Sequence, residues 1–252
     1  MFKILAIISS YGLLHCPQRF IDVLNSWVMQ RGDFDLDIVV SDNRSSEEVA
    51  DFFRSMAKQH SNFHAVLTKD DLTVYQSFNV AVKVCDGPKY DYIISSWEDV
   101  SFISDCHLDI MVKDMQPNFA LLQGWTNTKA FPSHLQNSAP LMVKKLRDNG
   151  GTPYILQKGE ISCPHMAIYN RSFFEAYDFK TIDVIANPGI DDQLWFASAA
   201  LEMYWAICTK ITLIHQGYTK KVKRFVKLHG LKHGSNSKIN SRDVTNIIRN
   251  GI

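Results

Sequence analysis

The sequence lacks the features by which several specialised classes of protein are recognised. Its five cysteines are scattered and form no C-x-x-C pair, which argues against a zinc knuckle, a redox dithiol or a disulfide-dense secreted domain. No run of residues approaches the roughly 20 apolar residues of a membrane-spanning helix. Charge of one sign is not in excess, because 27 Lys and Arg residues face 26 Asp and Glu residues. No glycine-rich phosphate loop follows the first apolar segment, which disfavours a nucleotidyltransferase.

The chain does contain enough apolar residues for a large core. Of its 252 residues, 46% are hydrophobic and 21% charged, which is typical of a globular protein of one or two domains. No repeat, low-complexity stretch or linker divides it. The apolar run at 4–8 is short and precedes no small-residue cleavage site, so it predicts a buried first strand rather than a signal peptide. We therefore expect one domain with a C-terminal extension, in a soluble, cytoplasmic protein.

Charge is unevenly distributed along the chain. From residue 210 to 252 there are ten basic residues and one acidic residue, Asp243, a net charge of +9. Because the whole chain carries +1, the residues before 210 carry −8. A basic segment on an acidic body favours an anionic partner such as nucleic acid, a phosphorylated ligand or a membrane surface. A solvated charged face is the structural alternative.

Strand and helix patterns alternate in the first half of the chain. Apolar runs predict buried strands, and apolar residues at helical spacing predict helices between them. The expected strands cover 3–9, 36–40, 63–68 and 90–95, and the expected helices cover 17–30, 47–56 and 73–85. This order predicts an α/β fold with a mostly parallel central sheet and helices on both faces. The second half is less regular, with strands expected at 119–124, 166–169 and 205–213 and helices at 171–177 and 191–202.

The carboxyl ends of the expected parallel strands carry polar residues. In sheets of this kind ligands bind beyond these ends, which here are 9–11, 42–43, 68–71 and 96–99. Three of the four carry carboxylates. We therefore expect the four ends to converge on one site.

Seven segments between residues 4 and 215 follow one another in a recognisable order. They read ILAIISSYG, FIDVLNSWVMQ, DIVVSDNRSSEEV, VYQSFNVAVK, YDYIISSWEDVSFI, HMAIYNRSFFEAYDF and GIDDQLWFASAA. Together they resemble the GT-A glycosyltransferases of the family-two type. The resemblance implies a Rossmann-like nucleotide-sugar half over 1–100 and an acceptor half over 101–215, followed here by the basic extension, 216–252.

The activity that this resemblance implies is transfer of a sugar from a nucleotide-diphosphate donor, UDP-linked in our interpretation, to an acceptor hydroxyl. The Q-x-x-R-W signature of processive members is absent, and the chain has no long apolar run. We therefore expect transfer of a single sugar to a discrete acceptor.

The resemblance places the nucleotide-sugar site at the strand ends. Asp42 matches an acidic residue that contacts the uracil base, where a carboxylate can accept the imide N–H. Sequence alone also allows an ordinary turn aspartate. The other positions that the resemblance places near the donor are Ser9, Tyr11, Asp71, Asn79, Trp97 and Glu98.

The resemblance also implies a divalent metal, Mn²⁺ or Mg²⁺, which neutralises the leaving nucleoside diphosphate at a D-x-D motif. Here Trp97 replaces the first aspartate, Glu98 follows, and only Asp99 matches a metal ligand, so strong metal binding does not follow from the motif. His215 matches a position that often supplies another ligand, although a single histidine beside an apolar strand is more often structural. Trp97 fits a core aromatic and a substrate-stacking residue equally well.

Acidic residues late in the chain match the catalytic base of inverting members. Asp192 is the expected general base and Asp191 the next choice, because a carboxylate opposite the leaving group can deprotonate the acceptor hydroxyl as it attacks the anomeric carbon. An acidic helix start stabilised by the helix dipole is the structural alternative. On the acceptor side the resemblance places His165 and Trp195, although Trp195 also fits a core residue.

Two acceptor classes fit the sequence. The basic residues Lys220, Lys221, Lys223 and Arg224 favour a polyanion, such as DNA carrying a hydroxylated base, as in phage-type DNA modification inside an infected cell. A base within a duplex would then have to be flipped out or reached through a groove. A surface or lipid-linked glycan is the other acceptor, with the basic extension on anionic lipid. Trp97 also supports a different class of function, a non-catalytic module that binds a sugar nucleotide or a glycan.

Overall fold

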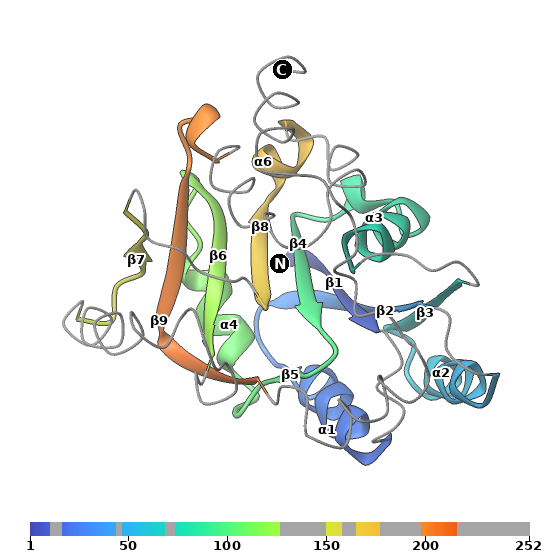
Figure 1. Ribbon diagram of the computed structural model, residues 1–252. Helices are drawn as coiled ribbons and strands as arrows, with labels where there is room; N and C mark the ends of the chain where they lie inside the picture. Colours follow the sequence, from blue (N-terminus) through green and yellow to red (C-terminus); the bar gives the residue numbers. More distant parts are fainter. Residues whose placement is uncertain are drawn as a thin grey trace, which may run out of the picture.

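The computed structural model describes residues 1–10, 17–43, 47–68, 74–126, 150–157, 165–176 and 198–215, which form an α/β fold on one large sheet (Figure 1). In the first half strands alternate with helices: β1 (Phe2–Ser10), α1 (Pro17–Val28), β2 (Phe34–Asn43), α2 (Glu47–Gln59), β3 (Phe63–Thr68), α3 (Val74–Val84), the short 3-10 helix η2 (Gly87–Lys89) and β4 (Tyr92–Trp97). The second half contains β5 (Val100–Ser101), α4 (His107–Asp114), β6 (Phe119–Thr126), β7 (Tyr154–Ile155), β8 (Met166–Asn170), α6 (Arg171–Ala176) and β9 (Tyr204–His215).

In the described part of the chain the sheet contains nine strands, eight of them in the order β3-β2-β1-β4-β8-β6-β9-β5, and β7 also pairs with β9. Strands β3, β2, β1 and β4 are mutually parallel, as the sequence predicts. Strand β8 runs antiparallel to both β4 and β6, whereas β6 and β9 are parallel. Strands β5 and β7 are antiparallel to β9. The α/β class is thus confirmed, with a parallel first half and a mixed second half.

Most elements lie close to their expected positions. Strand β3 has the predicted bounds, and β4 begins two residues later than predicted because the N–H of Tyr90 still closes the turn on the carbonyl of Gly87 (3.0 Å). Elements β5, α4 and β7 were not predicted. Of the helix expected over 191–202, residues 198–200 are helical and 191–197 lie outside the described residues.

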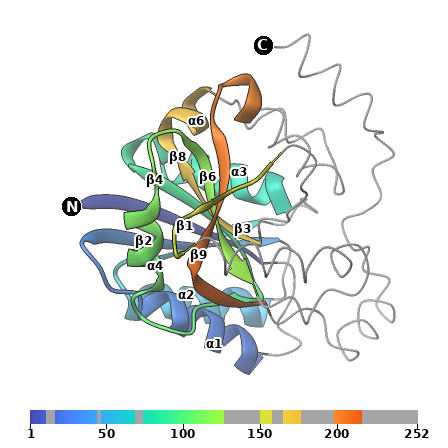
Figure 2. The same ribbon diagram turned by 90° about the vertical axis from the view of Figure 1, so that its left-hand side faces the viewer.

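Helices cover both faces of the sheet, as the sequence predicts (Figures 1 and 2). Strand β1 is buried on both sides, which explains why its residues 4–8 are all apolar. Ile4, Ala6 and Ile8 pack toward α1, α2 and α4. Leu5 and Ile7 pack toward α3 and α6. The alternation of a strand therefore assigns each residue at its carboxyl end to one of the two faces.

Contacts near β9 fix the strand that ends at the candidate site. The buried carboxylate of Asp114 on α4 accepts from the ammonium of Lys210, and the Cys208 thiol lies 3.6 Å from its other oxygen. Strand β6 approaches β9 so closely at Gly124 that an added Cβ would lie 2.3 Å from Cδ1 of Leu213. These contacts join β9 to α4 through a charged pair and to β6 through close packing.

Candidate functional site

The parallel strands end level with one another at one edge of the sheet. Ser9 of β1 is in register with Ser41 of β2 on one side and with Trp97 of β4 on the other. Ser10 is in register with Asp42, which in turn is in register with Leu67 of β3. The expected donor residues Ser9, Asp42 and Trp97 therefore lie at a single edge.

Asp42 is a buried carboxylate at this edge, with 2% of its surface exposed. Strand alternation puts it on the same face as Ile38 and Val40, and it puts Ser10 on the same face of β1. The Ser10 hydroxyl is buried and has no hydrogen-bond partner among the described residues. A carboxylate and a hydroxyl thus lie side by side in a buried environment. A polar group of a ligand that bound here would lose its contact with water and would need these two groups as hydrogen-bond partners.

Side-chain hydrogen bonds from α3 fix the end of β2. The Ser41 hydroxyl donates to the carbonyl of Ser77 at 2.7 Å, and the Ser77 hydroxyl donates to Ser41 Oγ at 2.8 Å. Both residues are buried, so these bonds are shielded from water. They hold the backbone next to Asp42, while Asn79 lies half-buried further along the same helix.

Asp99, in the turn before β5, and His215, at the end of β9, form a buried pair. After β4 the chain turns through Glu98 and Asp99, and Val100 of β5 then pairs with His215 at the end of β9. Asp99 Oδ2 lies 3.1 Å from His215 Nε2, and the two side chains are 8% and 3% exposed. Asp99 Oδ1 is also buried and has no hydrogen-bond partner within the described ranges. Glu98, beside the pair in sequence, is buried as well.

Two aromatic side chains pack against His215. The ring of His165 stacks on it with a centroid separation of 4.2 Å and an interplanar angle of 24°. The indole of Trp97 meets His165 edge-on at 4.7 Å and His215 at 6.0 Å. The backbone N–H of Trp97 donates to the carbonyl of His165 at 2.9 Å, so β4 holds His165 in place through the main chain as well.

The environment of His165 keeps its imidazole neutral. Burial removes it from water, and a positive charge on the neighbouring His215 would repel a second one, whereas the Asp99 carboxylate acts in the opposite direction. The net effect lowers the pKa of His165 from its ordinary value of 6.5 to about 3.

The pair of Asp99 and His215 fits a divalent cation in its donor chemistry. Carboxylate oxygen and imidazole nitrogen are both ligands of Mn²⁺. Asp99 Oδ1, for which the described residues provide no hydrogen-bond partner, is the kind of buried atom that a cation would satisfy. In the described part of the chain no three His, Cys, Asp or Glu side chains are grouped to hold a metal ion. The remaining ligands would therefore come from water or from a phosphate-bearing ligand.

Several expected site residues lie outside the described residues. They are Tyr11, Asp71, Asp191, Asp192, Trp195, Lys220, Lys221, Lys223 and Arg224. Ser10 is the site residue that sequence reasoning missed. Its position on the same face as Asp42 follows from strand alternation, a signal that was present in the apolar pattern of the two strands.

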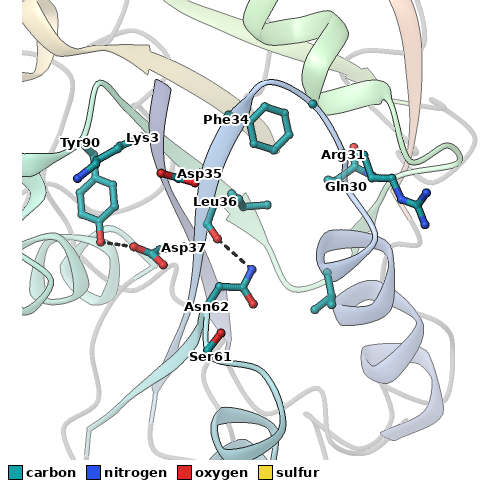
Figure 3. A pocket seen from close by; sticks show the side chains of 12 residues that line it. Lys3, Gln30, Arg31, Phe34, Asp35, Leu36, Asp37, Ser61, Asn62 and Tyr90 are labelled. Atoms are coloured by element: carbon teal, nitrogen blue, oxygen red, sulfur yellow. Dashed lines mark hydrogen bonds between the residues drawn. The ribbon is translucent and has the colours of Figure 1, made fainter. Parts of the chain in front are cut away.

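A hollow lies at the opposite edge of the sheet, among the amino ends of the strands (Figure 3). Its volume is about 630 Å³, and Lys3, Asp37 and Tyr90 are among the residues that line it. Its polar groups are partly paired, because the Tyr90 hydroxyl donates to Asp37 Oδ2 at 2.7 Å and Asn62 donates to the carbonyl of Leu36 at 3.0 Å. Ser10 lies seven positions after Lys3 along β1, which is about 23 Å of strand. The hollow is therefore separate from the candidate site.

Among the described helices, none is long and apolar enough to cross a membrane.

Known structures resemble this chain, although neither a protein-family profile nor a curated protein sequence matches it. PcManGT, a mannosyltransferase from Pyrobaculum calidifontis solved with GDP-Man and Mn²⁺, matches with a TM-score of 0.62 and 13% identity over 88% of this chain. Residues 1–349 of S. aureus TarS match with a TM-score of 0.58 and 14% identity over 98% of this chain and 69% of that fragment. GalNAc-T7, solved with UDP, GalNAc and Mn²⁺, matches with a TM-score of 0.59 and 10% identity over 90% of this chain and 48% of its own.

The chain spans 59% of the length of the mannosyltransferase. At sequence identities of 10–14%, these similarities show a shared fold and do not show a shared reaction. The three neighbours are glycosyltransferases, and the seven segments found in the sequence predict the same architecture. The chain has the GT-A fold.

Proposed function

We propose that this protein is a glycosyltransferase that moves one sugar from a nucleotide-diphosphate sugar to an acceptor hydroxyl. The observation that carries the proposal is the arrangement at the carboxyl edge of a GT-A sheet. There Asp42 is buried at the end of β2, and the Asp99–His215 pair is buried beside the end of β4. Ligands of open α/β sheets bind at this edge.

Asp42 is the residue we assign to the nucleotide base. Its buried carboxylate can accept the imide N–H of uracil, and the hydroxyl of Ser10 on the same face can bond to the base or ribose. Ser9 alternates to the other face of β1, and it stays in the proposed donor site through the resemblance. A uridine donor is favoured by this pairing, and UDP-GlcNAc is the ligand in one structure of TarS. Tyr11, Asp71 and Asn79 complete the proposed donor site; the first two lie outside the described residues.

Asp99 and His215 are the residues we assign to a divalent metal. A bound Mn²⁺ or Mg²⁺ would supply charge neutralisation for the leaving diphosphate. Structures of PcManGT and GalNAc-T7 both contain Mn²⁺, which supports this assignment. Because an imidazole is one of the two protein donors, we expect Mn²⁺ to bind more tightly than Mg²⁺. Glu98 and Trp97 flank the donor in this proposal, Trp97 as a wall rather than a ligand.

The chemical step in this proposal is a direct displacement at the anomeric carbon. Asp192 accepts the proton of the acceptor hydroxyl as its oxygen attacks, the bond to the diphosphate breaks, and the configuration inverts. Asp191 is the alternative base. His165 and Trp195 belong to the acceptor half, residues 101–215, in the same scheme. The test is transfer by Asp192→Asn, which should bind nucleotide like the wild type and turn over at least 100-fold more slowly.

A thermal-shift experiment tests the donor site. UDP, GDP and CDP are added with and without Mn²⁺ to the wild type, Asp42→Asn and Asp99→Asn, with the exposed Asp33→Asn as control. A ligand at 100 times its Kd stabilises the native state by about 2.7 kcal/mol, which raises Tm by several degrees. We expect a Mn²⁺-dependent shift with UDP that either site variant loses and the control keeps. A shift of equal size in Asp42→Asn would contradict the base assignment.

The acceptor we favour is a polyanion, with DNA carrying a hydroxylated base as the specific case. The support is the net charge of +9 over 210–252, a segment that includes Lys220, Lys221 and Lys223. Their triple substitution by Ala should weaken DNA binding and reduce its salt dependence. The matched control is Lys58, Lys83 and Lys89 to Ala, an equal charge change at exposed positions. Unchanged DNA binding by the first variant would favour a surface or lipid-linked glycan instead.

A non-catalytic sugar-nucleotide or glycan-binding module is the second candidate function, and Trp97 in place of a motif carboxylate is the observation that favours it. The two candidates differ in turnover. A protein that gives the thermal shift with a donor sugar but neither transfers nor hydrolyses it would belong to this second class.

A further inference from the structure

The ring of His165 lies against the pair that we assign to the metal. It is 2% exposed, and its centroid is 4.2 Å from that of His215 with the planes 24° apart. Strand β8, which begins at the next residue, runs antiparallel to β4, and this pairing brings His165 beside the end of β4. The contact is therefore built into the sheet.

The stacked arrangement separates the roles of the two histidines. The nitrogen lone pairs of an imidazole lie in the plane of its ring, so two rings stacked face to face direct their lone pairs along nearly parallel planes. Such rings cannot both point at a single ion. His215 Nε2 lies 3.1 Å from Asp99 Oδ2, so His215 is the histidine placed to bind a metal together with Asp99. His165 then packs against this pair without binding the metal.

Trp97 is the second aromatic side chain that packs against His215. Its ring is nearly perpendicular to that of His165, with an interplanar angle of 86°, and its centroid lies 6.0 Å from His215. One flat face and one ring edge therefore restrict the His215 side chain. Metal-binding side chains that are already held in one orientation lose less conformational entropy when the ion binds.

We propose that His165 is a positioning residue, whose ring holds the imidazole of His215 in the orientation in which its Nε2 binds the metal beside Asp99. The inference rests on the metal assignment made under the proposed function. Metal-bound histidines are commonly oriented by a hydrogen bond from a neighbouring group. Here a stacked ring performs this task, in a chain where Trp97 takes the place of a second carboxylate.

Mn²⁺ binding measured by electron paramagnetic resonance tests this role without any turnover. Free Mn²⁺ is titrated against the wild type, His165→Phe, His165→Leu and His165→Ala in the presence of UDP, and the exposed His64→Ala is the control. Loss of groups around a metal ligand typically weakens affinity 10- to 100-fold. We expect a loss of this size in the Ala and Leu variants, a change of less than about threefold in the Phe variant, and none in the control.

The outcomes distinguish the possible errors. Equal Mn²⁺ affinity in the wild type and the Leu and Ala variants overturns the positioning role. A Phe variant as weak as the Ala variant overturns it too, because His165 would then act through its nitrogens. Electron spin echo spectroscopy of bound Mn²⁺ should detect one coordinated histidine nitrogen in the wild type, and two would make His165 a ligand. A wild type that binds no Mn²⁺ overturns the metal assignment itself, with all variants alike.

Discussion

Acidification should destabilise the protein through His165, and the size of the effect follows from its environment. Burial and the neighbouring His215 lower the pKa of His165 from 6.5 to about 3, with Asp99 opposing the change. Between these two values the unfolded chain binds a proton that the folded protein does not. The stability contributed by this residue is therefore complete above pH 6.5 and is lost as the pH falls toward 3. Each pH unit in this window corresponds to about 1.4 kcal/mol.

The variant His165→Phe isolates this contribution. Phenylalanine keeps a flat ring against His215 and does not titrate, and any packing penalty of its larger ring is the same at both pH values. Urea unfolding in EDTA at pH 7.5 and pH 4.5 gives the loss of unfolding free energy for each protein. We expect the wild type to lose about 2–3 kcal/mol more than the variant.

The neighbouring titratable groups are present in both proteins. They are His215 at the end of β9 and Asp99 in the turn before β5. Equal acid losses in the wild type and in His165→Phe would refute the reasoning. They would mean that His165 is protonated as easily in the folded protein as in the unfolded chain.

Three further predictions concern the strand that carries His215. Gly124→Ala should lower the unfolding free energy by about 1–3 kcal/mol, because the added methyl would lie 2.3 Å from a β9 side-chain carbon; an unchanged Tm would contradict this close approach. Lys210→Met should lower the unfolding free energy measured in urea by leaving the buried Asp114 carboxylate without its cation, and Asp114→Asn in the same chain should recover most of the loss. The Cys208 thiol should resist a thiol reagent in the folded protein, because burial raises its pKa to about 12, while the exposed Cys106 reacts; early labelling of Cys208 by mass spectrometry would show that β9 opens.

The parallel half of the fold could be predicted because its signals are local. Residues 4–8 form a continuous apolar run, as a strand buried on both faces requires, and the helices between the strands show regular apolar spacing. Strands β5 and β7 could not be predicted in this way, since two residues carry no period. Nor does the apolar content of β8 reveal that it runs antiparallel to its neighbours.

The candidate site was predictable in its parts but not in its assembly. Asp99 and His215 were found by resemblance, and the contact between them depends on the pairing of Val100 with His215. The stacking of His165 on His215 depends on β8 lying beside β4, which is a property of the whole sheet. Ser10 was accessible to sequence reasoning, since its face follows from counting residues along β1.

The insertion of β8 between β4 and β6 has a consequence for synthesis of the chain on the ribosome. Strands β1 to β4 can pair as soon as residue 97 has emerged, but β4 then presents an open hydrogen-bonding edge until β8 follows about 70 residues later. At the usual 5–20 residues per second this interval lasts roughly 4 to 14 s. During that time the apolar edge YIISSW is open to pairing with another nascent chain. Slower translation after residue 97 has emerged and before residue 170 has emerged should therefore increase aggregation, whereas slower translation after residue 170 has emerged should not.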